Sequence, residues 1–280
     1  MRTPPAKQRR PVRVYKFTRA KYAIECIESG YLKVTTLDEL NDPFELCPAY
    51  DNRTGASRHL IELHKRTWRK EMGKNYGIIS FSEFSGDPVL WSHYADLHTG
   101  VALEFDPSQM PSELLPVTYS KDRVTVDLHL DSTPIEQQRE ALQRVVRTKY
   151  QSWGYESEYR LIVSLSDCVP RHGFYFLPVT ALRITAILLG IRCTVSYEYM
   201  RRLRRASQIA ELRSVPVHVS QMSPYRYSII NDRTCEPPPN FSKQRKGAPN
   251  KMPEHDLEKP RFARPLKSGQ ARRSGTEDDT

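Results

Sequence analysis

Two glutamates and an arginine are spaced two residues apart in the segment WGYESEYRLIV, residues 153–163. Aromatic and β-branched residues dominate the segment and apolar residues alternate with polar ones, so we predict a β-strand. Glu156, Glu158 and Arg160 would then point to one face, with neighbours about 7 Å apart. This arrangement is either a chemically active pair of carboxylates beside a guanidinium or an ion-pair ladder on a solvent-exposed face.

Two further segments, NDPFE and WSHYAD, gather polar and aromatic side chains that could line a site with these glutamates. The candidates in them are Asn41, Asp42, Glu45, Trp91, His93, Tyr94 and Asp96. They are too numerous for a core and too clustered for a random surface, so we expect them near the glutamate strand. His93 and His98 are five residues apart without an H-E-x-x-H motif, and no G-x-S-x-G motif is present. We therefore expect neither a metal site nor a nucleophilic serine.

The elements that must position these residues follow an α+β pattern. Strands are predicted at VRVYKFT, YLKVTT, YGIISFS, GVALEFD, GFYFLPV, ITAILLG, VPVHV and YRYSII. Helices are predicted from Thr18 to Ser29, over about 56–72, from Pro88, after a capping box at Thr133 and Glu136, and from Tyr197 to Leu212. Helices between and beside strands predict a single α+β domain over residues 14–232, with a mixed or antiparallel sheet flanked by helices.

The formal charge of +10 is concentrated at the two ends of the chain. Residues 1–13 carry five basic and no acidic residues, and residues 233–280 carry eleven basic and seven acidic residues. Both segments are poor in apolar residues, so we expect a basic, disordered N-terminus and a disordered, proline-rich basic tail. Such tails either aid solubility or make weak, non-specific contacts with nucleic acid or acidic partners.

Cysteine usage and hydropathy indicate the compartment. The five cysteines are scattered, odd in number and without a C-x-x-C pair, so neither a disulfide framework nor a zinc knuckle is expected. No segment approaches the roughly 18 apolar residues of a membrane span, and the basic start leads into no apolar signal region. We expect a cytoplasmic protein without a membrane partner.

Several motifs occur together in a specific order: YKF, GYLKVTTLDELNDPFE, ISFSE, WSHYADLHTGVALEFD, VTY and K...W.YESEYRLI. This order resembles the mainly bacterial family known as domain of unknown function 2971, over roughly residues 14–232. NDPFE, WSHYAD.H.GVALEF and YESEYR are its most specific pieces. The resemblance implies a family but no reaction.

A second resemblance concerns the layout of ADP-ribosyltransferases, which place a basic residue on the first strand, a serine on a later strand and a Glu-x-Glu pair. It implies that Lys16 holds the ribose or phosphates of NAD, that Ser82 supports the nicotinamide side, and that Glu158 is the catalytic carboxylate. Lysine lacks the planar fork of the usual arginine, and ISFSE differs from the usual serine-threonine-serine triplet. Glu156 would orient or deprotonate an acceptor, and Arg160 would pair with Glu158 or meet a pyrophosphate.

These resemblances imply an NAD-consuming transferase whose acceptor is a protein, a nucleic acid or a small molecule. Trp91, His93 and Tyr94 would then line the cofactor pocket with the residues of the ADP-ribosyltransferase layout. The alternative is a non-catalytic nucleotide-binding or sensor module, in a phage-defence or toxin context, that holds the same ligand without turning it over.

Overall fold

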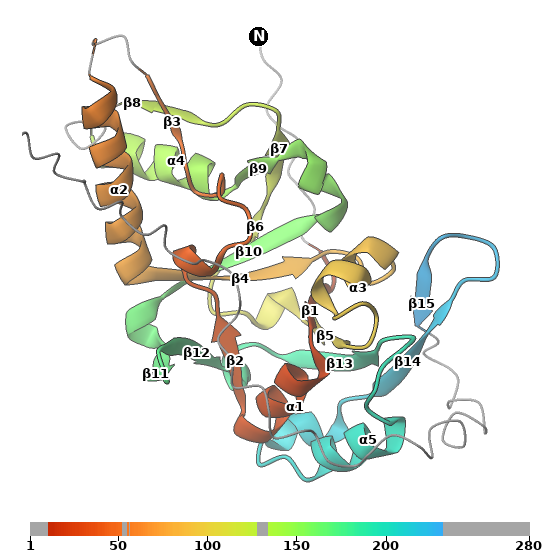
Figure 1. Ribbon diagram of the computed structural model, residues 1–280. Coiled ribbons are helices and arrows are strands. Elements are labelled where there is room, and N and C mark those ends of the chain that lie inside the picture. Colours follow the sequence, from red (N-terminus) through yellow and green to blue (C-terminus); the bar gives the residue numbers. More distant parts are fainter. Residues whose placement is uncertain (1–10, 52–54, 56, 128–133, 232–280) are drawn as a thin grey trace, which may run out of the picture. The chain divides into compact units, whose positions relative to one another are not determined.

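A computed structural model describes residues 11–51, 55, 57–127 and 134–231 (Figure 1). These residues belong to one compact unit, Met1–Gln244, and a second unit, Arg245–Thr280, lies outside the described residues. The tail predicted over residues 233–280 and the cap predicted at Thr133 also lie outside them. Of the predicted N-terminal tail, residues 11–13 are described, and Arg13 Nε lies 3.3 Å from Glu104 Oε1.

An eight-stranded sheet forms the centre of the described unit. In sheet order its strands are β15 (Ile229–Asn231), β14 (Val217–Met222), β13 (Ile184–Leu189), β5 (Val101–Phe105), β1 (Val14–Thr18), β4 (Tyr76–Ser82), β10 (Glu158–Ser164) and β6 (Leu115–Pro116). Neighbouring strands are antiparallel except β13 and β14, which are parallel. The prediction of an α+β domain with a mixed sheet is confirmed.

The described part of the chain also contains three smaller sheets. Their members are β11 (Val169–Arg171), β12 (Phe174–Pro178) and β2 (Tyr31–Val34) in one sheet, β3 (Ala49–Asp51) and β8 (Thr125–Asp127) in a second, and β7 (Thr118–Ser120) and β9 (Thr148–Tyr150) in a third. The last two pairs are parallel. Of these strands, the sequence predicted β2 and β12. It did not predict β3, β7, β8, β9 and β11, because each has only three residues and shows no alternation.

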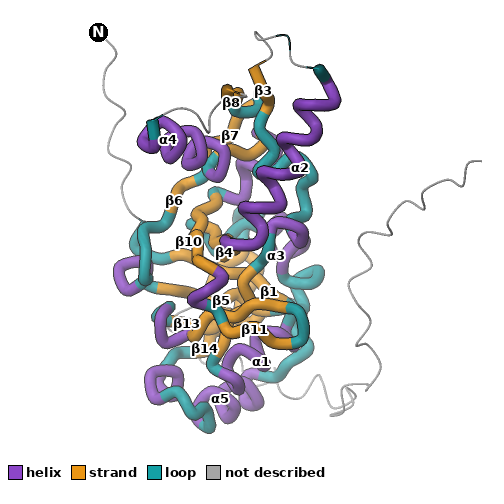
Figure 2. Tube along the Cα trace, turned by 90° about the vertical axis from the view of Figure 1, so that its left-hand side faces the viewer, coloured by secondary structure: helices purple, strands orange, loops and turns teal. Residues whose placement is uncertain are grey.

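Five α-helices of the described residues accompany the sheets. They are α1 (Ala20–Ser29), α2 (Arg58–Asn75), α3 (Pro88–Tyr94), α4 (Ile135–Val146) and α5 (Tyr197–Arg205). Shorter 3-10 helices are η1 (Leu37–Glu39), η2 (Pro107–Gln109), η4 (Gln151–Glu156), η5 (Leu165–Asp167), η6 (Val179–Ala181) and η7 (Ala210–Ser214). Helices α1 and α5 contact each other and lie side by side in both views (Figures 1 and 2).

Local chemistry explains several helix boundaries. Gly30 ends α1 in the left-handed region at φ 76°, and the Asp87 side chain accepts a hydrogen bond from the backbone N–H of Val89 to cap α3. The basic helix predicted to reach Leu212 ends earlier, at Arg205. There the buried Ser207 hydroxyl donates to the carbonyl oxygen of Ile27 at 3.0 Å, which draws the chain out of the helix toward α1.

The main core packs on one face of the large sheet and under α1 and α5. Its fully buried members include Ala23, Ile27, Ile79, Leu103, Phe105, Leu161, Ile187 and Met200. On the opposite face, a second cluster forms around Trp91 and Tyr15, and a third around Leu37, Ile78 and Val146.

The edge of β4 is shared between two different partners. β4 pairs with β1 at Tyr15 and Ser82, and Thr35, just after β2, forms an isolated bridge with Ile78. Between these two points, residues 79–81 of β4 have no strand partner on that side within the described part of the chain. Because β2 continues into a different sheet with β12, the sheet divides at this position.

Candidate functional site

A cavity of about 240 Å³ opens where the sheet divides, and we call it the split-sheet cavity. Its wall is built from β1, the segment after β2, β4, α3, β9 and the start of β10. Seven candidates from the sequence line it: Lys16, Asn41, Glu45, Ser82, Tyr94, Glu156 and Glu158. They come from segments that are far apart in the chain, so the fold brings five of the motifs together at one place.

The segment that carries the two glutamates is not one continuous strand. Residues Gln151–Glu156 form the 3-10 helix η4, Ser157 adopts a left-handed conformation at φ 43°, and β10 begins at Glu158. The Ser157 carbonyl oxygen accepts a hydrogen bond from Glu83 N at 3.0 Å, which fixes this turn. The prediction of a strand from residue 153 is therefore wrong before Glu158. The turn nevertheless delivers Glu156 to the side of Glu158.

Five charged side chains form a buried network beside the cavity: Glu45, Lys149, Glu156, Glu158 and Arg160. Each is at most 6% exposed. An ion-pair ladder needs a solvent-exposed face, so that alternative is wrong for this strand. Removing charges from water is costly unless they are paired, and breaking one buried pair destabilises strongly. The stability of each charge in the network therefore depends on the other four.

Arg160 joins Glu158 on its own strand to Glu45 of the NDPFE segment. Its Nε donates to Glu158 Oε1 at 2.9 Å and its Nη2 donates to Glu158 Oε2 at 3.1 Å. Nη2 also donates to Glu45, and Nη1 donates to the carbonyl oxygen of Val146 at 2.8 Å. All three guanidinium nitrogens thus donate hydrogen bonds to protein acceptors. This corrects the expectation that Arg160 contacts a cofactor; of the two roles predicted for it, it has the pairing with Glu158.

Lys149 is the second cation of the network, and the sequence analysis did not assign it a role. Its Nζ lies 2.6 Å from Glu156 Oε2, 3.2 Å from Glu158 Oε2 and 3.6 Å from Glu45 Oε1. The Trp153 ring covers the ammonium, with 4.9 Å from Nζ to the ring centroid. The K...W.YESEYR spacing was the signal that could have identified Lys149, because lysine and tryptophan precede the glutamates there.

Tyrosine side chains complete the contacts of the two glutamates. The Tyr94 hydroxyl donates to Glu156 Oε1 and accepts from Asn41 Nδ2 at 3.3 Å. The backbone N–H of Glu158 donates to the Tyr119 hydroxyl at 2.8 Å. Tyr119 belongs to the VTY motif, and no role in the site was predicted for it.

The two glutamates differ in protonation behaviour because their surroundings differ. Burial by itself would raise the pKa of Glu158, but the charges of Arg160 and Lys149 lower it to about 2. Burial raises the pKa of Glu156 above its usual value, and Lys149 and the Tyr94 hydroxyl only partly oppose this. Glu158 is therefore held ionised, while Glu156 is the carboxylate that accepts a proton more readily.

Lys16 of β1 also lines the cavity and is partly exposed. Burial lowers its pKa to about 8, against the attraction of Glu158, which raises it. The charge of Lys16 is therefore costly in the protein as it stands, and an anionic group in the cavity would reduce that cost.

Besides Arg160, four predicted residues do not line the split-sheet cavity. Trp91 is fully buried in the core, where its Nε1 donates to the Ser85 carbonyl oxygen at 2.7 Å. His93 is exposed and its Nδ1 lies 2.9 Å from the Tyr155 hydroxyl. The Asp96 side chain is 51% exposed and lies 3.6 Å from Arg19 Nε. These placements correct the expectation that the whole WSHYAD segment lines the site, since α3 points Trp91 and His93 in different directions and Asp96 lies beyond the end of the helix.

Asp42, the fourth of these residues, lines a neighbouring cavity instead. It is 6% exposed, and its Oδ1 accepts a hydrogen bond from Phe44 N at 2.9 Å within the NDPFE turn. The NDPFE segment therefore faces two cavities, with Asn41 on one and Asp42 on the other.

Comparisons with known proteins agree with part of this description. Residues 90–161 match the family described as Protein of unknown function (DUF2971). The predicted resemblance to that family is therefore confirmed over a segment that contains WSHYAD, Lys149 and YESEYR. No curated protein and no solved structure matches the chain.

None of the described helices combines the length and the apolar composition that crossing a membrane requires. Within the described residues, no group of three or more histidine, cysteine, aspartate and glutamate side chains is arranged to hold a metal ion.

Proposed function

We propose that the split-sheet cavity binds NAD and that the protein is an NAD-consuming enzyme similar to ADP-ribosyltransferases. The observation that carries this proposal is that Lys16, Ser82 and Glu158 line one cavity. These are the three residues that the resemblance assigns to NAD binding and catalysis, and they come from three different strands. Their convergence is what an enzyme of this type requires.

The size of the cavity supports binding of part of a dinucleotide. Pockets for drug-sized ligands usually measure roughly 300–1,000 Å³, and the split-sheet cavity measures about 240 Å³. It would hold the nicotinamide and its ribose, with the adenosine half outside. Lys16 would contact a phosphate oxygen, because its charge is incompletely compensated in the free protein.

The charge of the network also favours this ligand. Glu45, Glu156 and Glu158 contribute three carboxylates, whereas Lys149 and Arg160 contribute two cations. When all are ionised, one negative charge is left in excess in a poorly hydrated place. The nicotinamide ring of NAD carries a positive charge, and the ribose becomes oxocarbenium-like as the bond to nicotinamide breaks. An excess carboxylate stabilises both.

In the proposed reaction the bond between nicotinamide N1 and ribose C1′ breaks, and its electron pair leaves with nicotinamide. Glu158 accepts a hydrogen bond from the ribose 2′-hydroxyl and stabilises the positive charge that develops on the ribose. The acceptor then forms a bond to C1′ and gives up one proton. Glu156 takes that proton, consistent with its raised pKa. Tyr94 orients Glu156 through its hydrogen bond.

One observation favours the alternative, a module that binds a nucleotide without turnover. Arg160 and Lys149 already neutralise most of the charge of Glu158, which weakens its stabilisation of a cation. Such a module would hold the ribose hydroxyls through the same carboxylates.

Nicotinamide release from NAD by the purified protein tests the proposal. We expect release by the wild type, a loss of roughly 100-fold or more in Glu158→Gln, and cleavage without transfer in Glu156→Gln. Asp96→Asn is the matched control, because it removes an exposed carboxylate near α3 and should leave release unchanged. All variants are assayed well below their melting temperatures.

The outcomes separate the two functions. Release that persists in Glu158→Gln would contradict the assigned catalytic carboxylate. NAD binding by calorimetry without any release from the wild type would support the binding module. Neither binding nor release would refute both.

A further inference from the structure

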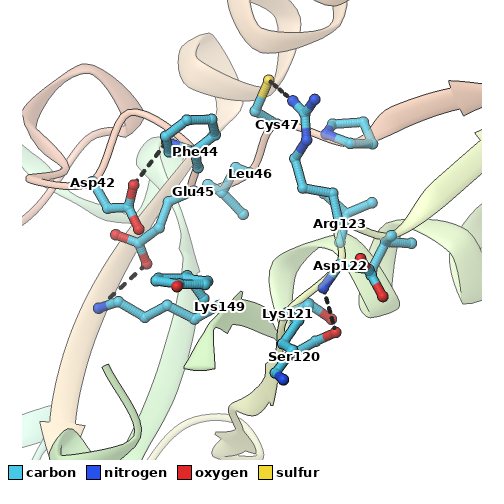
Figure 3. A pocket seen from close by; sticks show the side chains of 15 residues that line it. Asp42, Phe44, Glu45, Leu46, Cys47, Ser120, Lys121, Asp122, Arg123 and Lys149 are labelled. Carbon is cyan, nitrogen blue, oxygen red and sulfur yellow. Dashed lines mark hydrogen bonds and ion pairs between the residues drawn. The ribbon is translucent and has the colours of Figure 1, made fainter. Parts of the chain in front are cut away.

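A second cavity of about 450 Å³ lies beside the split-sheet cavity, and we call it the loop cavity (Figure 3). The NDPFE segment and the two residues after it form one side, and the turn at residues 120–124 forms the other. Strand β9 contributes Thr148, Lys149 and Tyr150. Neither resemblance assigns this cavity a role.

The loop cavity shares two buried residues with the split-sheet cavity. Glu45 and Lys149 line both, and Lys149 Nζ lies 3.6 Å from Glu45 Oε1. This ion pair therefore forms part of the partition between the two spaces. A ligand that interacts with Glu45 from the loop cavity would change the charge felt in the split-sheet cavity.

Asp42 supplies a buried carboxylate that has no cation of its own. It is 6% exposed, and within the described part of the chain no ion pair joins it to a lysine, arginine or histidine. Its Oδ1 is used by Phe44 N, which leaves Oδ2 for another partner. Figure 3 shows the carboxylates of Asp42 and Glu45 close together on one side of the cavity.

Adding Asp42 to the buried network increases its excess of negative charge. Its carboxylates are Asp42, Glu45, Glu156 and Glu158, and its cations are Lys149 and Arg160. An unpaired buried charge is costly, so a cationic partner at Asp42 would be favourable.

Two exposed cations, Lys121 and Arg123, also line the loop cavity, and within the described residues neither forms an ion pair with Asp42. Arg123 contacts other groups. Its Nη1 lies 3.8 Å from Cys47 Sγ, and its guanidinium lies 5.8 Å from the centroid of the Phe44 ring. Figure 3 shows Arg123 on the side of the cavity opposite to Asp42. The space between them is bordered by apolar and aromatic side chains: Phe44, Leu46, Pro48, Val124, Val145 and Tyr150.

We propose that the loop cavity binds an organic cation, an ammonium or guanidinium group carried on an apolar stem. The cation pairs with Asp42 and the free side of Glu45, and the stem packs against the apolar wall. This combination of a few convergent polar groups and an apolar wall is typical of small-molecule sites. The proposal stands independently of NAD cleavage, because it concerns binding at a different cavity.

Calorimetric titration of the full-length protein tests this inference. The guanidinium probe is Nα-acetyl-arginine amide, and the ammonium probe is Nα-acetyl-lysine amide. Nα-acetyl-citrulline amide is the neutral control, since its ureido group has nearly the shape of guanidinium without the charge. We expect the wild type to bind at least one cationic probe at least about tenfold more tightly than the citrulline probe.

Two variants locate the site. Asp42→Asn keeps the size and the Oδ1 acceptor that Phe44 N requires, so it should fold and bind the cationic probe at least about tenfold more weakly. Asp122→Asn removes an exposed carboxylate that also lines the cavity, and we expect it to bind within about twofold of the wild type.

Three results would overturn the inference. The first is no binding of either cationic probe up to about 10 mM. The second is equal binding of the citrulline and arginine probes by the wild type, which needs no variant. The third is unchanged binding in folded Asp42→Asn.

Discussion

Replacing Glu158 by glutamine tests whether the buried network has the electrostatics that its geometry implies. The carboxylate accepts from Arg160 Nε at 2.9 Å and lies 3.2 Å from Lys149 Nζ. Its pKa falls from 4.5 to about 2. At 1.36 kcal/mol per pKa unit, this corresponds to about 3 kcal/mol of stability at pH 7. Breaking a buried pair costs a similar amount, about 3–5 kcal/mol.

We therefore expect Glu158→Gln to lower the free energy of unfolding by about 3 kcal/mol at pH 7, or the melting temperature by roughly 6–12 °C. The folded-state pKa lies below the unfolded value, so this contribution is fully present above about pH 4.5 and is lost as the pH falls through about 2. The difference between variant and wild type should thus shrink by more than about half at pH 3.

Urea unfolding followed by circular dichroism measures the difference at both pH values. The matched control is Glu62→Gln on α2, where an exposed carboxylate lies 2.8 Å from Lys65 Nζ, and it should produce no measurable change. If Glu158→Gln behaves like Glu62→Gln, the buried network does not contribute as described, and the reasoning from burial and pairing is refuted.

Three further predictions address the same cluster. Lys149→Met removes a cation that three glutamates share, so we expect it to lower the free energy of unfolding in urea by about 3–5 kcal/mol. Lys74→Met, on the exposed surface of α2, is the control and should not lower it. Equal effects of the two substitutions would contradict the role of Lys149. Tyr94→Phe removes the hydroxyl that donates to Glu156, so the pKa of that carboxyl should rise further in a carbon-13 NMR titration, and a fall would show that the hydrogen bond is not made. Burial lowers the pKa of Lys16 from 10.5 to about 8, so its charge is penalised below about pH 8, and Lys16→Met should stabilise the free protein by roughly 1–3 kcal/mol at pH 7. That gain should vanish above about pH 10.5, and destabilisation at pH 7 would refute the assigned penalty.

The sequence predicted the longer strands, the helices and the motifs. Short apolar segments predicted β1 and β4, alternation predicted β5, and the Asp87 cap with Pro88 predicted the start of α3, because these signals act over a few neighbouring residues. The three-residue strands β3, β7, β8, β9 and β11 left no such signal, since their pairing depends on partners elsewhere in the chain.

Within the candidate site, periodicity correctly grouped Glu158 and Arg160 on one face, but it left open whether that face is a site or a solvent-exposed ion-pair ladder. Burial of a charged residue depends on the cations and carboxylates that other segments supply, here Lys149 and Glu45. Trp91 was predicted to line the pocket, but it lies in the core. Its aromatic type fits a binding pocket, yet its position on α3 turns it into the core.

The amino-acid sequence by itself determined the α+β class, the family resemblance and most residues that line the split-sheet cavity, because motif identity and short-range periodicity are local properties. Only the tertiary structure decided that the sheet divides at β4, that Lys149 lies between three glutamates, and that Asp42 faces a second cavity. Each of these depends on contacts between segments distant in the chain, where strand pairing and buried charge compensation are satisfied only when the whole domain has folded.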